Sequence, residues 1–168
     1  MKNEDSKTKH MVLTAMLFAT AIVLSIVESM IPMPISIPGV KFGLSNIVVM
    51  YAMFFLNKRD ALMIAILKGV FAALTRGAVA GLLSLTGGVF SIVVMVVLMF
   101  ILKEKGSYFL YSMSGALFHN IGQFVAISII YTNMVWLYYL PILLVTGIIA
   151  GMITSVLLRF LLPALQKI

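Results

Sequence analysis

Three basic residues, Lys41, Lys68 and Arg76, stand inside or beside stretches of sequence that are otherwise almost wholly apolar. Ionisable side chains in such stretches are costly, and they normally face a protein interior or a wet cavity with a partner. The one acidic residue expected at the same level is Glu28, so three cations would face one carboxylate. The natural partner of the excess positive charge is an anion. We therefore predict a positively charged pocket for a small anionic ligand, with Glu28 as its counter-charge.

These residues also have structural interpretations, which stay open at the level of sequence. Lys68 and Arg76 could extend their charged ends to the membrane surfaces, and Lys41 could anchor the end of a helix. Glu28 could be the structural partner of one of these cations. Lys68 is the hardest to explain in this way, because it lies roughly 12 Å inside its apolar stretch at 1.5 Å per residue.

A second polar cluster, residues 119–123 (His-Asn-Ile-Gly-Gln), interrupts another apolar stretch. On a helix, His119 and Gln123 lie one turn apart, and Asn120 lies about 100° round from His119. Hydrocarbon cannot satisfy their donors and acceptors, so these side chains must face protein, water or a ligand. Hydrogen bonds between helices would account for them, but the nearby cations favour a binding site, where we expect them to orient the ligand together with Asn46. We expect no catalytic histidine, because no carboxylate or nucleophile lies near it in sequence.

The composition restricts the class of protein to which these residues can belong. Of the 168 residues, 62% are hydrophobic and 10% are charged, against about 45–50% and about a quarter in soluble domains. A chain this short cannot hide such an excess from water, which excludes a soluble enzyme and a disordered chain. The net charge of +7 is not clustered on one module, so we expect no nucleic-acid partner. Without cysteine there is no disulfide or thiolate metal site.

The remaining class is a small polytopic membrane protein embedded in the lipid bilayer. A membrane-spanning helix needs about 20 mostly apolar residues, and transmembrane strands would alternate apolar and polar residues, which these stretches do not. The sequence therefore predicts an all-α fold, a single membrane domain with six transmembrane helices and a polar tail at 1–9. The predicted helices are 11–30, 40–56, 61–80, 83–102, 108–131 and 136–162.

The distribution of basic residues predicts the orientation of these helices. With the N-terminus in the cytoplasm, nine of the twelve Lys and Arg residues fall on or near the cytoplasmic side, and only the three described above do not. Both termini are then cytoplasmic. We expect the first segment to be retained and not cleaved as a signal sequence, because its Ala19-Thr20-Ala21 triplet lies inside the apolar run.

Small residues recur four positions apart on three of the predicted helices, where they would let helix backbones approach closely. The pairs are Ala15-xxx-Ala19, Gly77-xxx-Gly81 (assigned to the third helix) and Gly147-xxx-Gly151. On the first helix, Glu28 projects roughly opposite to the Ala15/Ala19 face, so one side could meet a partner while the other faces the pocket. The apolar, proline-rich outer loop 31–39 is either an inert connector or, as we favour, a lid over a site open to the outside.

Together these features resemble the substrate-binding S components of energy-coupling factor (ECF) transporters. Those are six-helix membrane proteins with both termini inside and a lid-like first outer loop, and an Ala-xxx-Ala motif on helix 1 docks against the transmembrane T component. Ala15 and Ala19 match that motif. Residues 38–46 (Pro-Gly-Val-Lys-Phe-Gly-Leu-Ser-Asn) and 119–123 look like the signature of one family, called the Gx transporter family or "heptaprenyl diphosphate synthase component I". The resemblance covers essentially the whole chain.

The two family names imply different functions. Prenyl diphosphate synthases hold magnesium between aspartate-rich motifs, whereas this chain has only Asp5 and Asp60, neither with a second carboxylate at a useful spacing. We therefore expect no enzyme activity, no cofactor and no metal. The resemblance implies an S component of a prokaryotic cell membrane that captures a small anionic metabolite, such as a phosphate- or carboxylate-bearing isoprenoid or quinone precursor, or a vitamin. ATP hydrolysis would belong to partner ATPase subunits, since no phosphate-binding loop is present.

Two alternatives remain open. The chain could be a non-catalytic membrane accessory subunit of a prenyl diphosphate synthase, recognisable by association with a soluble, aspartate-rich partner. It could also be a stand-alone secondary carrier that transports without ATP. Such carriers often contain internal repeats, and the first three and last three predicted helices share no obvious pattern.

Overall fold

The computed structural model describes residues 2–31, 43–103, 106–130 and 136–165, with side chains described from 7 to 160 within those ranges except at 136–139. These residues form six helices and no strand, which confirms the all-helical prediction for the described part of the chain. The helices are α1 (Lys2–Met30), α2 (Leu44–Phe55), α3 (Lys58–Arg76), α4 (Ala78–Leu102), α5 (Tyr108–Ile130) and α6 (Trp136–Leu165). The predicted polar tail is not separate from the first helix, because α1 begins at Lys2.

Four of the helices contain segments long and apolar enough to cross a membrane. They are Lys7–Met30 in α1, α4, α5 and Leu140–Phe160 in α6. The chain is thus a multi-pass membrane protein. Helix α2 is apolar but has 12 residues, and α3 carries charge within and at the end of its length, so the six-span topology and the cytoplasmic termini stay predictions.

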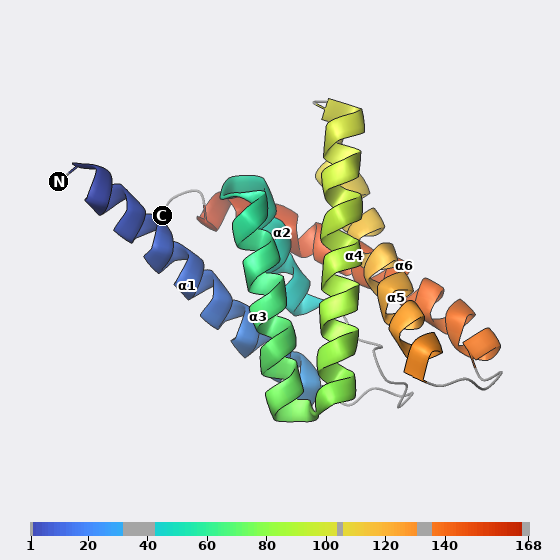
Figure 1. Ribbon diagram of the computed structural model, residues 1–168. Helices are drawn as coiled ribbons and strands as arrows, with labels where there is room; N and C mark the ends of the chain where they lie inside the picture. The colour runs from blue at the N-terminus through green and yellow to red at the C-terminus, as the bar shows by residue number, and fades with distance from the viewer. Residues whose placement is uncertain (1, 32–42, 104–105, 131–135, 166–168) are drawn as a thin grey trace.

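The helices form two groups of three that meet along two lines of contact (Figure 1). Helices α1, α2 and α3 pack on one another, and α5 packs between α4 and α6. The groups are joined where α3 lies beside α4, and again where α6 returns to α2. This arrangement surrounds a space that residues from all six helices can reach.

The turn between α3 and α4 differs from the sequence prediction. We expected the third helix to continue to 80 and the fourth to begin at 83, but the chain reverses at Gly77 alone, with φ 93° and ψ 165°. Residues with a side chain rarely adopt this φ, whereas glycine adopts it freely. Arg76 directly precedes the break, but we expected this charge to lie inside the third helix, because apolar residues continue beyond it. Gly77 and Gly81 therefore do not share the third helix, and Arg76 is the last residue of α3.

Small residues bring neighbouring helices into close contact. A Cβ atom added to Gly81 on α4 would lie 2.4 Å from the Cβ of Ala73 on α3. On α6, a Cβ at Gly151 would lie 3.0 Å from the Cα of Met113 on α5, and Gly147 meets the same helix. These contacts are too short for a larger residue unless a neighbour moves. The seams α3–α4 and α5–α6 thus depend on glycine.

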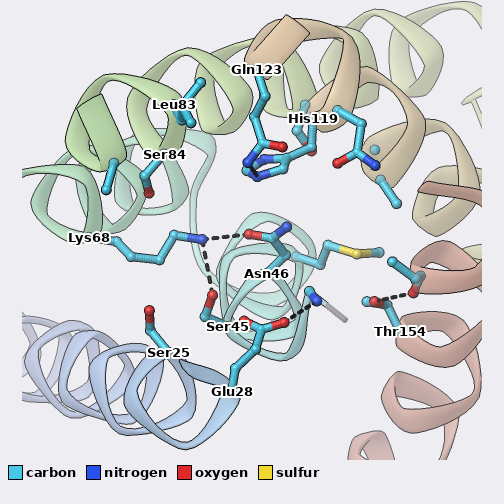
Figure 2. A pocket seen from close by; sticks show the side chains of 18 of the residues that line it. Ser25, Glu28, Ser45, Asn46, Lys68, Leu83, Ser84, His119, Gln123 and Thr154 are labelled. Atoms are coloured by element: carbon cyan, nitrogen blue, oxygen red, sulfur yellow. Dashed lines mark hydrogen bonds between the residues drawn. The ribbon is translucent and has the colours of Figure 1, made fainter. Parts of the chain in front are cut away.

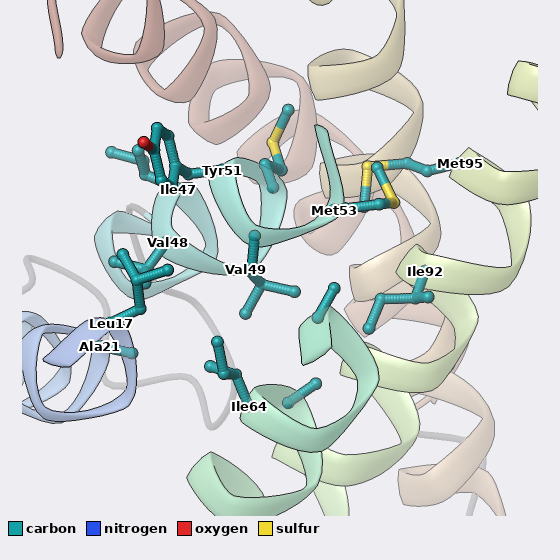
Figure 3. Close-up of a cluster of buried hydrophobic side chains, with 14 of the residues drawn as sticks. Leu17, Ala21, Ile47, Val48, Val49, Tyr51, Met53, Ile64, Ile92 and Met95 are labelled. Carbon is teal, nitrogen blue, oxygen red and sulfur yellow. The ribbon is translucent and has the colours of Figure 1, made fainter. Parts of the chain in front are cut away.

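The apolar core lies where α2 is enclosed by α1, α3, α4 and α6 (Figure 3). Residues 47–53 of α2 are buried without interruption, as expected of a helix that is apolar on all sides. From α1, only the face that carries Leu17 and Ala21 joins this core. Near the start of α1, His10 Nε2 lies 2.9 Å from a carboxylate oxygen of Asp60, which fixes α1 against the first turn of α3.

Candidate ligand-binding cavity

The two helix groups enclose a cavity of about 340 Å³ (Figure 2). Residues from all six helices line it. Small-molecule sites span about 300–1,000 Å³, so this volume lies at the lower end of that range. The cavity is therefore of a size to hold a small metabolite.

Seven of the eight residues predicted to bind a ligand line this one cavity, although they are far apart in sequence. They are Glu28, Asn46, Lys68, Arg76, His119, Asn120 and Gln123. The eighth, Lys41, lies outside the described residues, as does the proposed lid except for Ile31. The structure thus assembles the two polar clusters of the sequence around one space.

Lys68 is buried, with 4% of its surface exposed, and its ammonium points into the cavity (Figure 2). Nζ donates hydrogen bonds to Oδ1 of Asn46 at 2.5 Å and to Oγ of Ser45 at 3.2 Å. Both acceptors are neutral, and within the described ranges no carboxylate lies within salt-bridge distance of Lys68. An ammonium has three donors, so the third hydrogen is available to a ligand.

The carboxylate of Glu28 is bound to backbone, and no described cation lies within salt-bridge distance of it. It accepts hydrogen bonds from the N–H groups of Gly43 and Leu44, the latter at 3.3 Å, at the start of α2. Unpaired N–H groups and the helix dipole make a helix N-terminus attractive to an anion. Toward the described cations Glu28 is therefore a counter-charge only at longer range, and its direct contacts hold α1 against α2.

Arg76 lines the cavity from the C-terminal end of α3. Its Nη2 lies 3.4 Å from Oγ of Ser25 on α1. A cation at this end of a helix also complements the dipole. The guanidinium has five donors, so the weak contact with Ser25 leaves most of them for a ligand.

On α5, His119 and Gln123 form a hydrogen-bonded pair through their Nε2 atoms, 3.3 Å apart. Each of them also carries a buried polar atom that has no hydrogen-bond partner among the described residues, namely Nδ1 of His119 and Oε1 of Gln123. The imidazole packs on α4 at Gly87, where an added Cβ would lie 2.8 Å from Cε1. The absence of a side chain at Gly87 makes room for this ring.

Asn120 lines the cavity, but its amide nitrogen is committed to α6. Nδ2 donates to the backbone oxygen of Leu143 at 2.6 Å and lies 3.4 Å from Oγ1 of Thr146. This is the interhelical hydrogen bonding that the sequence left open as an alternative. Asn120 therefore ties α5 to α6, and the predicted role in orienting a ligand falls mainly to its neighbours.

Sequence reasoning missed the hydroxyl groups of the wall, which come from Ser25, Ser45, Ser84, Ser91, Ser112 and Thr154. Serine and threonine are ordinary components of membrane helices, where they often bond to their own backbone, as Thr154 does to the oxygen of Ala150 at 2.7 Å. Most of them gave no signal of their own. The exceptions are Ser45, which stands beside Asn46, and Ser112, which lies two turns before His119 on the same face of the helix.

The charges of the described wall sum to +1, from Lys68 and Arg76 against Glu28. Most of its polar groups are donors or hydroxyls, which suits an anion that carries several acceptor oxygens. Within the described ranges, no three His, Cys, Asp or Glu side chains gather as a metal site would require. The polar groups of the described wall are thus complementary to those of a small anion.

Comparison with known proteins yields one family. The family model described as heptaprenyl diphosphate synthase component I matches residues 17–161, which is most of the chain. No curated protein and no solved structure is significantly similar to it.

Proposed function

The chain belongs to the heptaprenyl diphosphate synthase component I family, and we propose that within it this protein is the substrate-binding subunit, or S component, of an ECF-type uptake transporter. It would take a small anionic metabolite from outside a prokaryotic cell into the cavity described above. Passage inward would follow docking on a T component and its ATPase subunits, which would supply the energy.

The observation that carries this proposal is the buried ammonium of Lys68. It points into a cavity, and its hydrogen-bond partners among the described residues are both neutral. A buried charge without a counter-ion is expensive, and within membrane proteins such groups usually mark a substrate or ion path. A ligand carboxylate or phosphate would supply the missing negative charge. A purely structural lysine would be expected to have an acidic partner.

The exposed face of α1 supports docking on a partner in the membrane. Ala15 and Ala19 are exposed, while Glu28 on the opposite face is 3% exposed and lines the cavity. Small side chains four residues apart let a second helix approach closely. The same helix could therefore contact a T component on one side and the ligand site on the other.

The family description favours a second candidate, a membrane accessory subunit of a prenyl diphosphate synthase. In that case the chain would associate with a soluble catalytic subunit. The volume of about 340 Å³ is too small for a full-length heptaprenyl chain, since sites of this size hold small ligands. An accessory role would thus leave the cavity unexplained. A stand-alone carrier would use the cavity but not the small-residue face of α1.

Co-expression with an ECF T component and its ATPase pair, followed by affinity purification, tests the proposal. We expect the wild-type chain to co-purify and Ala15→Trp/Ala19→Trp to be lost from the complex. The matched control is Val93→Trp/Val97→Trp on α4, which replaces two apolar residues that are also four positions apart, 53% and 48% exposed. The control should still co-purify.

Failure of the wild-type chain to associate would contradict the S-component assignment. Co-purification with a soluble prenyl synthase subunit instead would favour the accessory role. Transport into vesicles without ATP or partners would favour a stand-alone carrier.

A further inference from the structure

The unpaired polar atoms of the cavity narrow the chemistry of what it binds. We infer that the occupant is a small organic anion of one negative charge that also carries an N–H or O–H donor. Lys68 and Arg76 bind the anionic group, and Gln123, held by His119, accepts the donor. This inference rests on the proposed function only in taking the cavity to be a ligand site.

The anionic group follows from the balance of charge. The described wall carries two cations and one carboxylate, and that carboxylate is bound to the backbone N–H groups that begin α2. One negative charge on the ligand neutralises this described part of the wall. A diphosphate would bring further negative charge to a pocket that already contains the carboxylate of Glu28. The balance thus favours a monoanion over a prenyl diphosphate.

The requirement for an N–H or O–H donor on the ligand follows from the hydrogen-bonded pair of His119 and Gln123 on α5. Nε2 of Gln123 lies beside Nε2 of His119 at 3.3 Å, so the amide N–H donates to the ring and the amide oxygen is left over. That oxygen is buried without a hydrogen-bond partner in the described part of the chain. Leaving a buried acceptor unpaired is costly, so a ligand that brings a donor to Gln123 gains over an analogue that lacks it.

The volume and the remaining wall limit the body of the ligand. The cavity of about 340 Å³ is at the small end for metabolite sites. The wall also includes the apolar side chains of Met50, Ala116 and Ala150. A compact body with apolar surface, such as a single ring, fits these constraints.

The test measures thermal unfolding of the purified full-length chain in the presence of matched probes. The probes are benzoate, its three hydroxylated positional isomers, the corresponding hydroxybenzamides and isopentenyl diphosphate, each up to millimolar concentration. We expect at least one hydroxybenzoate to raise the unfolding temperature. Benzoate should bind about tenfold or more weakly, because it leaves the acceptor of Gln123 unpaired. The amides and the diphosphate should give no shift.

Three variants assign the two ends of the probe to side chains. Gln123→Met should remove the preference for the hydroxylated acid. It replaces an unpaired buried acceptor by an apolar group of similar size but also removes the hydrogen bond to Nε2 of His119, so the unliganded protein should unfold at a temperature close to or slightly below that of the wild type. Lys68→Met should abolish binding of every carboxylate. Arg76→Met, at the exposed end of α3, should weaken binding of the carboxylate probes. This variant replaces Lys68→Met in the test if Lys68→Met does not fold.

The control for these variants is Ser128→Ala, also on α5, whose hydroxyl bonds to the oxygen of Phe124 on its own helix at 2.8 Å. It should bind the probes as the wild type does. Equal binding of benzoate and the hydroxybenzoates would overturn the donor requirement. The inference that the ligand is a monoanion would be overturned if the amides or the diphosphate bound, or if none of the carboxylates bound. None of these results depends on docking to a T component, so the two proposals fail separately.

Discussion

The ammonium of Lys68 on α3 donates a hydrogen bond to Oδ1 of Asn46 on α2, with a donor–acceptor distance of 2.5 Å. Both side chains line the cavity. The contact holds the charge in place before any ligand arrives, so little ordering remains to oppose binding. The contact also joins α2 and α3 at the wall of the cavity. Its loss should therefore lower both the stability of the protein and its affinity for a ligand.

We expect Asn46→Ala to lower the free energy of unfolding by about 1.5–3 kcal/mol, the range for a hydrogen bond to a charged group. Lys68→Met should have less effect in the Asn46→Ala background than in the wild type, because the contact is already lost. The coupling energy of the double-mutant cycle should be about 1 kcal/mol or more. Denaturant or thermal unfolding in micelles measures all four states. Additive effects would mean that the contact does not contribute.

Glu28 gives a second prediction, because its carboxylate acts as an acceptor for the start of α2. Glu28→Leu removes that acceptor and should cost about 0.5–2 kcal/mol of stability, as the loss of a helix cap does. Glu28→Gln keeps an oxygen in the same place and should lose much less. The comparison is made by thermal unfolding of the two variants. Equal losses would show that the negative charge matters and the hydrogen bonds do not.

Much of the helical fold could be predicted from sequence because apolar runs and charges carry the necessary information. Six runs corresponded to six helices in the described residues. The cavity residues were found because ionisable and amide groups cannot remain in hydrocarbon, so Lys68 and Gln123 had to face inward together. For both residues, the signal was the free-energy cost of placing a charged or amide group in hydrocarbon, and not a sequence motif.

The end of α3 and the direction of Asn120 depended on three-dimensional packing, which the pattern of apolar and polar residues in a sequence does not specify. The turn at Gly77 directly follows Arg76, but a single charge can lie inside a membrane helix as well as at its end, so it did not indicate where α3 ends. Asn120 looked equivalent to Gln123, but it lies towards α6 and bonds to Leu143. Whether a buried amide faces a cavity or a neighbouring helix depends on how the helices pack, which a single sequence does not specify.

The α3–α4 seam gives a third prediction, an order of effects among glycines of one helix. A Cβ at Gly81 would lie 2.4 Å from the Cβ and 2.8 Å from the Cα of Ala73, whereas a Cβ at Gly88 would lie 3.3 Å from the Cβ of Ala65. Gly81→Ala should therefore cost about 1–3 kcal/mol through overpacking. Gly88→Ala should be close to neutral, since alanine regains up to about 1 kcal/mol of helix propensity.

Thermal unfolding of the two alanine variants provides the comparison. The measurement controls for helix propensity, because both residues lie inside α4 and undergo the same substitution. A larger loss in Gly88→Ala than in Gly81→Ala would contradict the close approach of α3 and α4 at Ala73. Backbone crowding, in contrast to side-chain crowding, offers no rotamer through which the strain could be relieved.

Gly87 gives the last prediction, because it positions the imidazole of His119. A Cβ at Gly87 would lie 2.8 Å from Cε1, 2.9 Å from Nδ1 and 2.8 Å from the backbone oxygen of His119. Gly87→Ala must displace the ring or separate α4 from α5, at a cost of about 1–3 kcal/mol. A displaced ring no longer holds Gln123, so preference for the hydroxylated probe should fall while co-purification with a T component is retained.

The double variant Gly87→Ala/His119→Ala separates the two consequences. It removes both ring contacts but keeps the contact with the backbone oxygen, so part of the stability should return while the probe preference does not. Gly88→Ala, one residue further along α4, is the control, since its Cβ would face Ala65 and not α5. If Gly87→Ala leaves both the unfolding temperature and the probe preference unchanged, the ring is not held by this contact. Gln123 would then have to be oriented by the ligand itself.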